Sequence, residues 1–427
     1  MAQALHRKAW WGAPEMFGTV GLRLGSSGAG FAATLVVTAA LGAAGAGFLF
    51  GTFIWASTIA IVSRWGGTDR ILLDGPPRAR AGRIGSLPPY VNRILAAAVA
   101  RSVVISAVIA MAVAVARYAG YHPVLSIGFL LVLSPATVVL QLVSATTKAL
   151  GRQNLAIALE FAAVPAAAIL AWALDRAGVI RGGFWMYAGV YAIATLLCAA
   201  LCFAIALARF WNTRTVPPLN PAQRRRTRDL ALVELASVVN GGIGLLGLPL
   251  LLSAADVGIF NVVFRIAGVF QLATSTVPII LFPKLSVARR TSNRAQFDSA
   301  LRDARLGMIG MAVAFVVGAF LAGPILLRAA GHEFTAGTTP LYILSGLFAL
   351  GTLTGPNAEV LAVLGRQDVT RRIALSVSVI AIVLLVPATL MAGLNGAAWV
   401  TGLAFLVQKL VALLCERRAL SALQWRT

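Results

Sequence analysis

The residues of this chain best suited to chemistry are charged side chains set inside long apolar segments. Arg265 lies seven residues past Gly258, near the start of such a segment. If the segment is a membrane helix, ~1.5 Å per residue puts Arg265 about 10 Å deep in a hydrocarbon layer ~30 Å thick. A charge at that depth usually faces a cavity or a partner. We therefore expect Arg265 either to attract an anionic substrate into a central cavity or to be held structurally, by backbone carbonyls or by an acid such as Glu234 or Glu359.

Three acidic residues are candidates for ion coupling. Glu160, Glu234 and Glu359 lie within about two helical turns of one end of their apolar segments. Carboxylates at such positions either titrate during coupled transport or pair with basic residues near the membrane surface. The sequence leaves both possibilities open for each of the three.

Basic residues near segment ends form a second group, which contains Arg23, Arg101 and Lys148. Their long side chains can simply extend to the membrane surface. Alternatively, they form a basic mouth to the cavity, which would suit a substrate that carries phosphate. With Arg265, these three are the predicted substrate-binding residues.

Glycines recur at short spacing in two apolar segments. They are Gly25, Gly28 and Gly30 in the first segment and Gly241, Gly242 and Gly244 in a later one. Small residues allow helices to pack closely, and a glycine-rich helix can also bend as a gate beside the cavity. Both roles are compatible with one another.

Catalytic and metal-binding patterns are missing from the sequence. Cys198, Cys202 and Cys415 lie in or beside apolar segments without ligand spacing, and the three histidines are scattered. No nucleophile with a base and no phosphate-binding loop is apparent. We therefore expect no enzyme activity, no cofactor and no metal.

Composition and charge indicate a membrane protein. Of 427 residues, 59% are hydrophobic and 12% are charged, whereas soluble proteins carry about 25% charged residues. The net charge of +22 is divided among short loops. We therefore expect contact with anionic membrane lipids and no binding of nucleic acid.

Twelve apolar segments, each close to the ~20 residues that cross a bilayer, must position these side chains. They lie near residues 17–40, 45–64, 92–116, 123–147, 154–174, 183–208, 230–252, 258–282, 304–328, 338–363, 371–392 and 396–415. Basic residues gather in every second gap, as between Arg64 and Arg83 and between Lys284 and Arg294. This alternation and the even number of spans predict a multi-pass protein with both termini in the cytoplasm.

The two halves of the chain are repeats in parallel orientation. Leu150–Asn154 recurs as Leu364–Asp368, an offset of 214 residues (364 − 150), and Gly28 matches Gly242 at the same offset. Each repeat holds six spans, so both cross the membrane in the same direction. We predict an N-lobe at 1–208, a basic cytoplasmic linker at 209–229 and a C-lobe at 230–427. The predicted fold class is an all-α integral membrane protein with two six-helix lobes.

Short motifs in the second half resemble polysaccharide-type flippases of the multidrug/oligosaccharidyl-lipid/polysaccharide exporter (MOP) superfamily. The residues that carry the resemblance are Val257–Phe260, Phe264–Ile266, Leu281–Ser286, Phe334–Ala336, Leu341–Leu344, Leu364–Arg366 and Gly393–Ala398. In the first half, Leu41-Gly42 with Gly47 resembles the family's first outer turn. Relatives often carry acids in the seventh span, where the nearest polar residue here is Asn240, which we add to the candidate ion-coupling residues.

The resemblance implies a MATE-like fold and a function in making cell-surface polysaccharide, such as lipopolysaccharide. It implies a flippase in the bacterial cytoplasmic membrane that moves a polyprenyl-pyrophosphate-linked oligosaccharide by alternating access. Membrane lipids, a polysaccharide polymerase and glycosyltransferases would be its partners. Two alternatives remain, a MATE-type exporter of drugs or small molecules and a membrane polysaccharide polymerase or ligase. A cation exporter should have an acidic cavity, and a polymerase or ligase typically needs a longer outer loop.

Overall fold

The computed structural model of the chain describes residues 13–68, 70–72, 87–121, 123–149, 152–180, 183–207, 221–268, 285, 288–289 and 293–422. These residues form helices, with no strand among them. The helices of the first half are α2 (Ala13–Arg64), α4 (Leu87–Tyr118), α5 (Ile127–Ala149), α6 (Gln153–Ile157), η2 (Ala158–Ala162), α7 (Ala163–Arg176) and α8 (Phe184–Leu207). The helices of the second half are α9 (Pro221–Leu251), a helix at 254–268, α11 (Arg294–Ala330), η3 (His332–Gly337), α12 (Thr338–Leu353), α13 (Asn357–Val363) and α14 (Gln367–Ser421).

Helix α2 contains two of the predicted spans and reverses between them. Its helical geometry breaks at Gly42, where φ is 68° and ψ is 178°, a conformation that glycine adopts without strain. Gly30 and Ser57 line the same cavity. Along a straight helix, ~1.5 Å per residue would separate them by about 40 Å. The chain therefore turns back near Gly42, in the gap predicted between the spans 17–40 and 45–64.

Helix α14 has the same construction. Its geometry breaks at Gly393, with φ 55° and ψ −131°. A Cβ added at Gly396 would overlap the carbonyl oxygen of Ala388, so the chain turns back between the spans predicted at 371–392 and 396–415. Within the described ranges, eight helices, α2 and α14 included, are long and apolar enough to cross a membrane.

The eighth predicted span is only partly described. The seventh, predicted at 230–252, lies in helix α9, which begins at Pro221 and ends at Leu251, so residues 221–229 of the predicted linker are helical. The helix at 254–268 covers the first part of the span predicted at 258–282, and residues 269–284 lie outside the described ranges. The count of twelve spans and the lobe boundaries therefore stay predictions.

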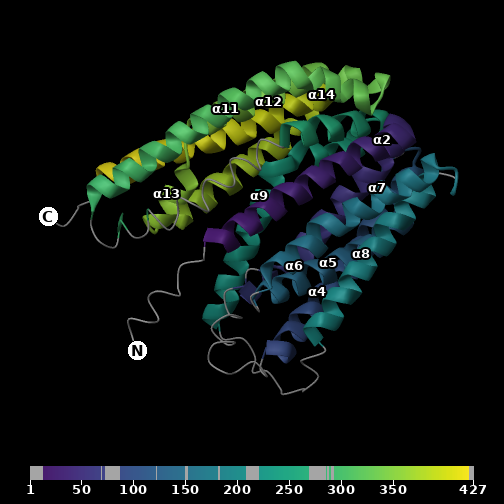
Figure 1. The fold of residues 1–427 in the computed structure, drawn as a ribbon, viewed down its shortest axis with the longest axis horizontal. Helices are drawn as coiled ribbons and strands as arrows, with labels where there is room; N and C mark the ends of the chain where they lie inside the picture. The colour runs from purple at the N-terminus through teal and green to yellow at the C-terminus, as the bar shows by residue number, and fades with distance from the viewer. Residues whose placement is uncertain are drawn as a thin grey trace.

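Helices pack mainly with others from the same half of the chain. In the first half α5 packs against α2, α4 and α8, and in the second half α14 packs against α9, α12 and α13. Each half has its own large apolar cluster, one around Phe50 and Tyr187 and the other around Phe260 and Phe348. Figure 1 shows that the two groups of helices converge at the upper right of the view and diverge toward the lower left.

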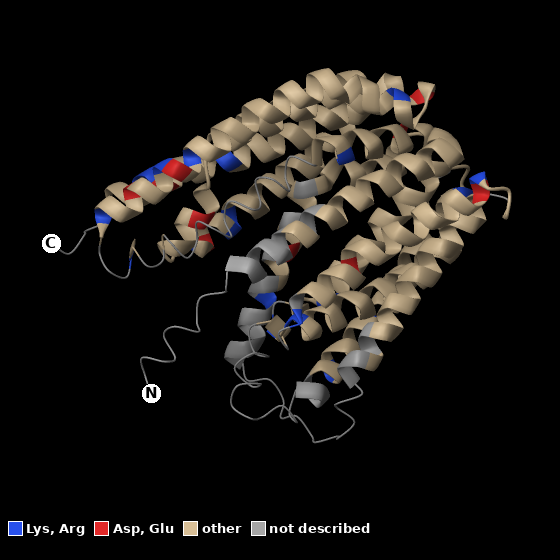
Figure 2. Ribbon diagram, in the orientation of Figure 1, with Lys and Arg blue, Asp and Glu red and all other residues tan. Residues whose placement is uncertain are grey.

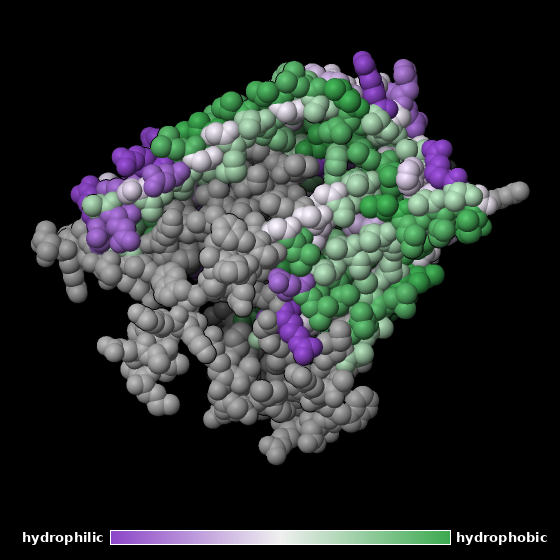
Figure 3. Space-filling model, in the orientation of Figure 1, coloured by the Kyte–Doolittle hydropathy of each residue, from purple (hydrophilic) through white to green (hydrophobic). Residues whose placement is uncertain are grey.

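The outer surface suits a lipid environment. Large apolar side chains are exposed along α4, α11 and α14, for example Val108, Val317 and Val383. Most charged positions lie near helix ends (Figure 2), and apolar residues cover the visible face of the long helices (Figure 3). The protein is therefore a multi-pass membrane protein, and the predicted all-α integral membrane class is confirmed.

The two halves meet closely where α2 reverses, and we call this region the Gly42 end of the interface. A Cβ added at Gly47 of α2 would overlap the carbonyl oxygen of Ala254, and one added at Gly258 would overlap that of Ala43. The backbones of α2 and of the helix at 254–268 are therefore in direct contact, which only glycine permits.

Polar groups also join the halves at the Gly42 end. Glu333 of η3 accepts a hydrogen bond from the backbone N–H of Ala43 at 2.5 Å, where the second part of α2 begins. Val124 N–H donates to the carbonyl of Pro249 at 2.8 Å, and the Tyr121 hydroxyl donates to the carbonyl of Leu250. Each half thus supplies partners for backbone groups that a helix end leaves unpaired in the other half.

Candidate substrate cavity

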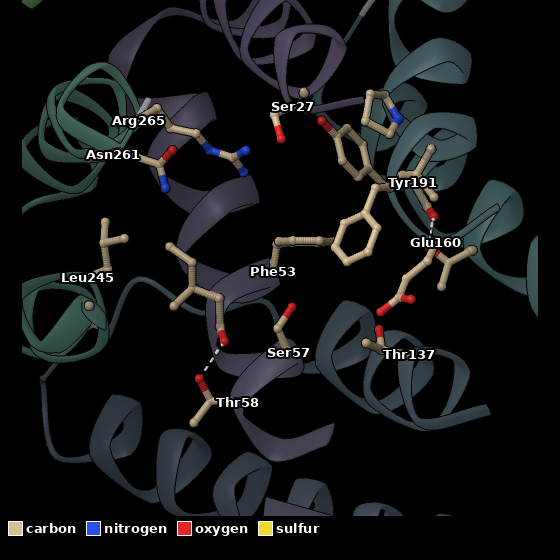
Figure 4. Close-up of a pocket in the computed structure, with 18 of the residues that line it drawn as sticks. Ser27, Phe53, Ser57, Thr58, Thr137, Glu160, Tyr191, Leu245, Asn261 and Arg265 are labelled. Carbon is tan, nitrogen blue, oxygen red and sulfur yellow. Dashed lines mark hydrogen bonds between the residues drawn. The ribbon is translucent and has the colours of Figure 1, made fainter. Parts of the chain in front are cut away.

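A cavity of about 650 Å³ lies between the two halves. Its walls come from α2, α5, η2, α7 and α8 of the first half, and from α9 and the helix at 254–268 of the second half. Its volume falls in the range of ~300–1,000 Å³ that is usual for small-molecule sites. Figure 4 shows side chains from both halves facing this space.

Arg265 points into the cavity from the helix at 254–268 (Figure 4). Its guanidinium carbon lies 5.9 Å from the centre of the Phe50 ring, and a Cβ on Gly30 would lie 3.8 Å from its Nη1. No described residue forms a hydrogen bond or ion pair with the guanidinium. Asn261, one turn earlier on the same face, is buried, and its Oδ1 has no hydrogen-bond partner. The second half thus presents a cation and an amide to the cavity.

Glu160 faces the cavity from the first half and has a fixed partner. Its Oε2 accepts hydrogen bonds from Lys148 Nζ at 2.5 Å and from Ser144 Oγ at 2.6 Å. Lys148 and Ser144 lie on α5, so the ion pair ties α5 to η2. Because Lys148 balances the charge of Glu160, the net charge of the cavity wall comes from Arg265.

Glu160 sits in a π-helical turn, η2, between α6 and α7. A π-turn widens the helix by one residue and is common at functional sites. Two features accompany it here. The Ser144 hydroxyl lies 3.4 Å from the Ala156 carbonyl in the turn before, and Pro165 in the turn after has no N–H to donate. The turn presents Glu160 and Phe161 to the cavity.

Other polar and aromatic side chains complete the wall. Gln141 and Thr137 reach it from α5, and the Gln141 Oε1 is buried without a hydrogen-bond partner. Tyr191 reaches it from α8 and packs edge-on against Phe53, with ring centres 5.8 Å apart. The cavity is therefore largely apolar, with a few polar groups that converge on it.

The other predicted ion-coupling residues lie outside this cavity. Glu234 of α9 forms an ion pair with Arg64 of α2 at 2.6 Å, so its partner is not Arg265. Asn240 of α9 donates to the Ala374 carbonyl at 2.9 Å and accepts from the Ser378 hydroxyl at 2.7 Å. Both residues connect α9 to its neighbours.

Glu359 lies on α13, and its Oε2 is buried without a hydrogen-bond partner. It forms no ion pair with Arg265. The alternative in which an acid holds Arg265 therefore finds no support in the described part of the chain.

The predicted basic residues are dispersed. Lys148 borders the cavity through its pair with Glu160, whereas Arg101 is exposed on α4 outside it. Arg23 belongs to α2, but its side chain lies outside the described residues. A common basic mouth formed by these three is not seen among the residues that the structure describes.

The structure places three of the six predicted glycines in one of the two expected roles. Gly30 and Gly242 line the cavity, and Gly242 breaks the helical geometry of α9, with φ −158° and ψ 35°. Gly244 packs tightly, since a Cβ there would approach Thr401 and Phe260 to under 3 Å. A Cβ at Gly25 or Gly28 would meet nothing within 4 Å, and Gly241 belongs to α9, but its surroundings lie outside the described residues.

Four residues that the structure makes prominent were not among the residues predicted from the sequence. Asn261, Gln141 and Tyr191 line the cavity, and Glu333 joins the halves. Asn261 could have been found because it precedes Arg265 by one helical turn in an otherwise apolar segment. The others carry no local signal, since their importance comes from contacts with distant parts of the chain.

Comparison with solved structures identifies the fold as that of membrane transporters. No protein-family model matches the chain, and no curated protein sequence matches it. An inward-facing multidrug resistance MATE family transporter of the MOP superfamily is 14% identical, with a TM-score of 0.66 over 94% of this chain and 98% of that one. The lipid II flippase MurJ, in an inward closed conformation, is 12% identical, with a TM-score of 0.69 over 92% of this chain and 86% of that one.

A third similar structure is a MOP superfamily transporter from Pyrococcus furiosus, described as having a binding pocket of reversed polarity. It is 12% identical, with a TM-score of 0.56 over 95% of both chains. The chain thus has a MATE-like fold, which is the fold that the sequence resemblance implied. MATE transporters and MurJ share this fold.

Proposed function

We propose that the protein is a flippase that moves a polyprenyl-pyrophosphate-linked oligosaccharide across the bacterial cytoplasmic membrane by alternating access. The observation that carries the proposal is the charge of the cavity. Arg265 faces it without a carboxylate partner among the described residues, whereas the carboxylate of Glu160 is balanced by Lys148. A net positive cavity inside a membrane favours an anionic substrate.

The architecture supports a substrate with a lipid tail. The cavity lies between the two halves, so a polyprenyl chain can remain in the bilayer while its head group enters. A pyrophosphate carries the negative charge that Arg265 is placed to bind. The similar fold of MurJ, which is described as a lipid II flippase, supports the idea that this fold can serve lipid-linked substrates.

We further propose that the basic loops and both termini lie in the cytoplasm, because basic residues gather in alternate loops. Surface polysaccharide or lipopolysaccharide synthesis would be the pathway. A polymerase and glycosyltransferases, which use the same lipid-linked glycan, would be the partners.

The second candidate function is export of small molecules, as in MATE transporters. The aromatic and apolar lining of the cavity, including Phe31, Phe53 and Phe264, favours it because such surfaces bind many drugs. Many drugs that such exporters carry are cations, however, and the charge of Arg265 opposes them. The polymerase or ligase alternative has less support, because the structures of similar fold are transporters.

A binding experiment separates the two candidates. Purified protein in nanodiscs is titrated with geranylgeranyl pyrophosphate and with an aromatic cation such as ethidium. We expect the pyrophosphate to bind, and Arg265→Ala to weaken it by about tenfold or more, with Arg265→Lys in between. Arg302→Ala, which removes an exposed charge from α11 outside the cavity, is the matched control. If the protein binds ethidium but not the pyrophosphate, the exporter is favoured. Tighter binding of ethidium to Arg265→Ala, again without pyrophosphate binding, would favour it further.

A further inference from the structure

The cavity wall opposite Arg265 is rich in hydrogen-bond acceptors. Lys148 and Ser144 both bond to Oε2 of Glu160, and no described residue bonds to its Oε1. Glu160 therefore keeps one oxygen available, while its charge and orientation are fixed. Figure 4 shows Glu160 and Thr137 side by side across the cavity from Arg265 and Asn261.

Two further acceptors on α5 adjoin Glu160. The Thr137 hydroxyl donates to the carbonyl of Leu133 at 2.7 Å, which leaves its lone pairs to accept. Gln141 follows one turn later on the same face, and its buried Oε1 lacks a hydrogen-bond partner. An amide oriented the other way would still leave one buried polar atom unpaired, so Gln141 requires a partner in either orientation. We call Thr137, Gln141 and Glu160 the acceptor wall.

The acceptor wall fits hydroxyl groups better than a cation. Lys148 neutralises Glu160, so the wall offers oxygen atoms without a net negative charge. Neutral donors such as hydroxyls satisfy these oxygens, whereas an ammonium group would add a second positive charge to the one on Arg265. The rings of Phe53 and Tyr191 also line the cavity and offer flat apolar surface, and Figure 4 shows them between the acceptor wall and Arg265.

We propose that the acceptor wall binds the hydroxyls of the sugar next to the pyrophosphate, and that Thr137, Gln141 and Glu160 determine which sugar is accepted. This inference rests on the proposed function, since it places the pyrophosphate at Arg265. The ligand then has an anion at one end and hydroxyl donors at the other, which matches the donor and acceptor sides of the cavity. Because the ion pair with Lys148 orders Glu160 in advance, binding costs little side-chain entropy.

Binding of matched probes tests the proposal. Bare geranylgeranyl pyrophosphate is compared with its glucosyl, galactosyl and N-acetylglucosaminyl derivatives on purified protein in nanodiscs. We expect at least one glycosylated probe to bind about tenfold tighter than the bare probe. Gln141→Leu, Thr137→Val and Glu160→Gln should each reduce that advantage to about threefold or less, because a site built for hydroxyls loses selectivity with its acceptors. Gln141→Leu and Thr137→Val should not change binding of the bare probe, whereas Glu160→Gln leaves Lys148 without its counter-charge and should tighten all four probes by a similar factor.

A matched control distinguishes the acceptor wall from the helix that carries it. Thr146 lies on α5 outside the cavity and, like Thr137, donates its hydroxyl to the carbonyl four residues earlier. Thr146→Val should keep the full sugar advantage. If no glycosylated probe binds more tightly than the bare one, or if Thr137→Val and Thr146→Val behave alike, the proposal is overturned.

The same titrations keep this inference separate from the proposed function. Arg265→Ala should weaken all four probes by a similar factor, because it acts on the pyrophosphate that they share. If Arg265→Ala changes the affinity of none of the four probes while the sugar advantage persists, Arg265 does not bind the pyrophosphate, but the acceptor wall still binds the sugar. If the acceptor-wall variants weaken binding of the bare probe as much as binding of the glycosylated probes, the wall does not recognise the sugar.

Discussion

The interface between the two halves is held in different ways at its two ends. At the Gly42 end, backbones touch at Gly47 and Gly258, and Glu333 pairs with the N–H of Ala43. At the other end, Arg64 of α2 pairs with Glu234 of α9. Along α2, Arg64 lies 22 residues from Gly42, roughly 33 Å at ~1.5 Å per residue. The cavity lies between the two ends.

This difference indicates which end opens more easily. Separating the Gly42 end would break close backbone packing and leave several helix-end groups without partners. Separating the Arg64 end requires the loss of contacts between long side chains, which can re-form with water or with new partners. We therefore expect access to the cavity to be controlled first at the Arg64 end.

Adding a methyl group where the two backbones touch at the Gly42 end should have the largest effect on stability. In Gly47→Ala or Gly258→Ala the new methyl group overlaps a carbonyl oxygen, so the halves must move apart. We expect a loss of about 3 kcal/mol or more, since close packing tolerates little added volume. Thermal unfolding in detergent measures it. Gly189→Ala on α8 is the control, because its Cβ meets nothing within 4 Å; an equal change in both would refute the close contact.

Breaking the ion pair at the Arg64 end should have an intermediate effect on stability and a clear effect on access. The side chains of Arg64 and Glu234 are 7% and 19% exposed. We expect Arg64→Gln or Glu234→Gln to cost about 2 kcal/mol, less than the ~3–5 kcal/mol of a fully buried pair. The double variant should cost less than the sum of the single ones.

Access is measured by labelling Ser57→Cys, a cavity position, with a water-soluble thiol reagent. The background carries serine at Cys198, Cys202 and Cys415. Labelling should accelerate when the ion pair is broken, and Thr146→Val serves as the control outside the cavity. Unchanged labelling in both single variants would mean that the Arg64 end does not control access.

Removing the carboxylate at the Gly42 end should have the smallest effect. Glu333→Ala leaves the N–H of Ala43 without its partner at the start of a helix, which we expect to cost about 1–2 kcal/mol. Glu333→Gln keeps an acceptor oxygen but loses the charge that favours a helix start. Its stability should therefore lie between that of Glu333→Ala and that of the unchanged protein. Unfolding midpoints measure both. Equal midpoints for Glu333→Ala and the unchanged protein would mean that water replaces the carboxylate at no cost.

Much of the fold follows from local features of the sequence. The lengths of the apolar segments predicted the helices, because a membrane helix must satisfy its own backbone. The short gaps between predicted spans, at 41–44 and 393–395, predicted the reversals at Gly42 and Gly393. The π-turn at Glu160 was not predicted. The hydrogen bond that holds Glu160 in this turn comes from Ser144, which lies 16 residues away and on another helix.

The site was predictable only in part, for the same reason. Depth in an apolar segment was enough to single out Arg265, which the structure places in the cavity. The pairing of Lys148 with Glu160 and of Arg64 with Glu234 required knowledge of which helices are neighbours. Glu333 contacts Ala43 across 290 residues, a distance over which sequence patterns carry no information about contact.

The π-turn at 158–162 makes the cavity sensitive to chain length at a single position. A π-turn holds one residue more than regular helical spacing needs, and each residue turns an α-helix by about 100°. In a regular α-helix a deletion would rotate one flank by that angle, but here the π-turn already absorbs the extra residue, so deleting one residue would leave α6 and α7 in their present orientations. The wide turn that presents Glu160 and Phe161 to the cavity would then be lost. A relative that is one residue shorter in this turn is thus expected to present a different wall to its substrate.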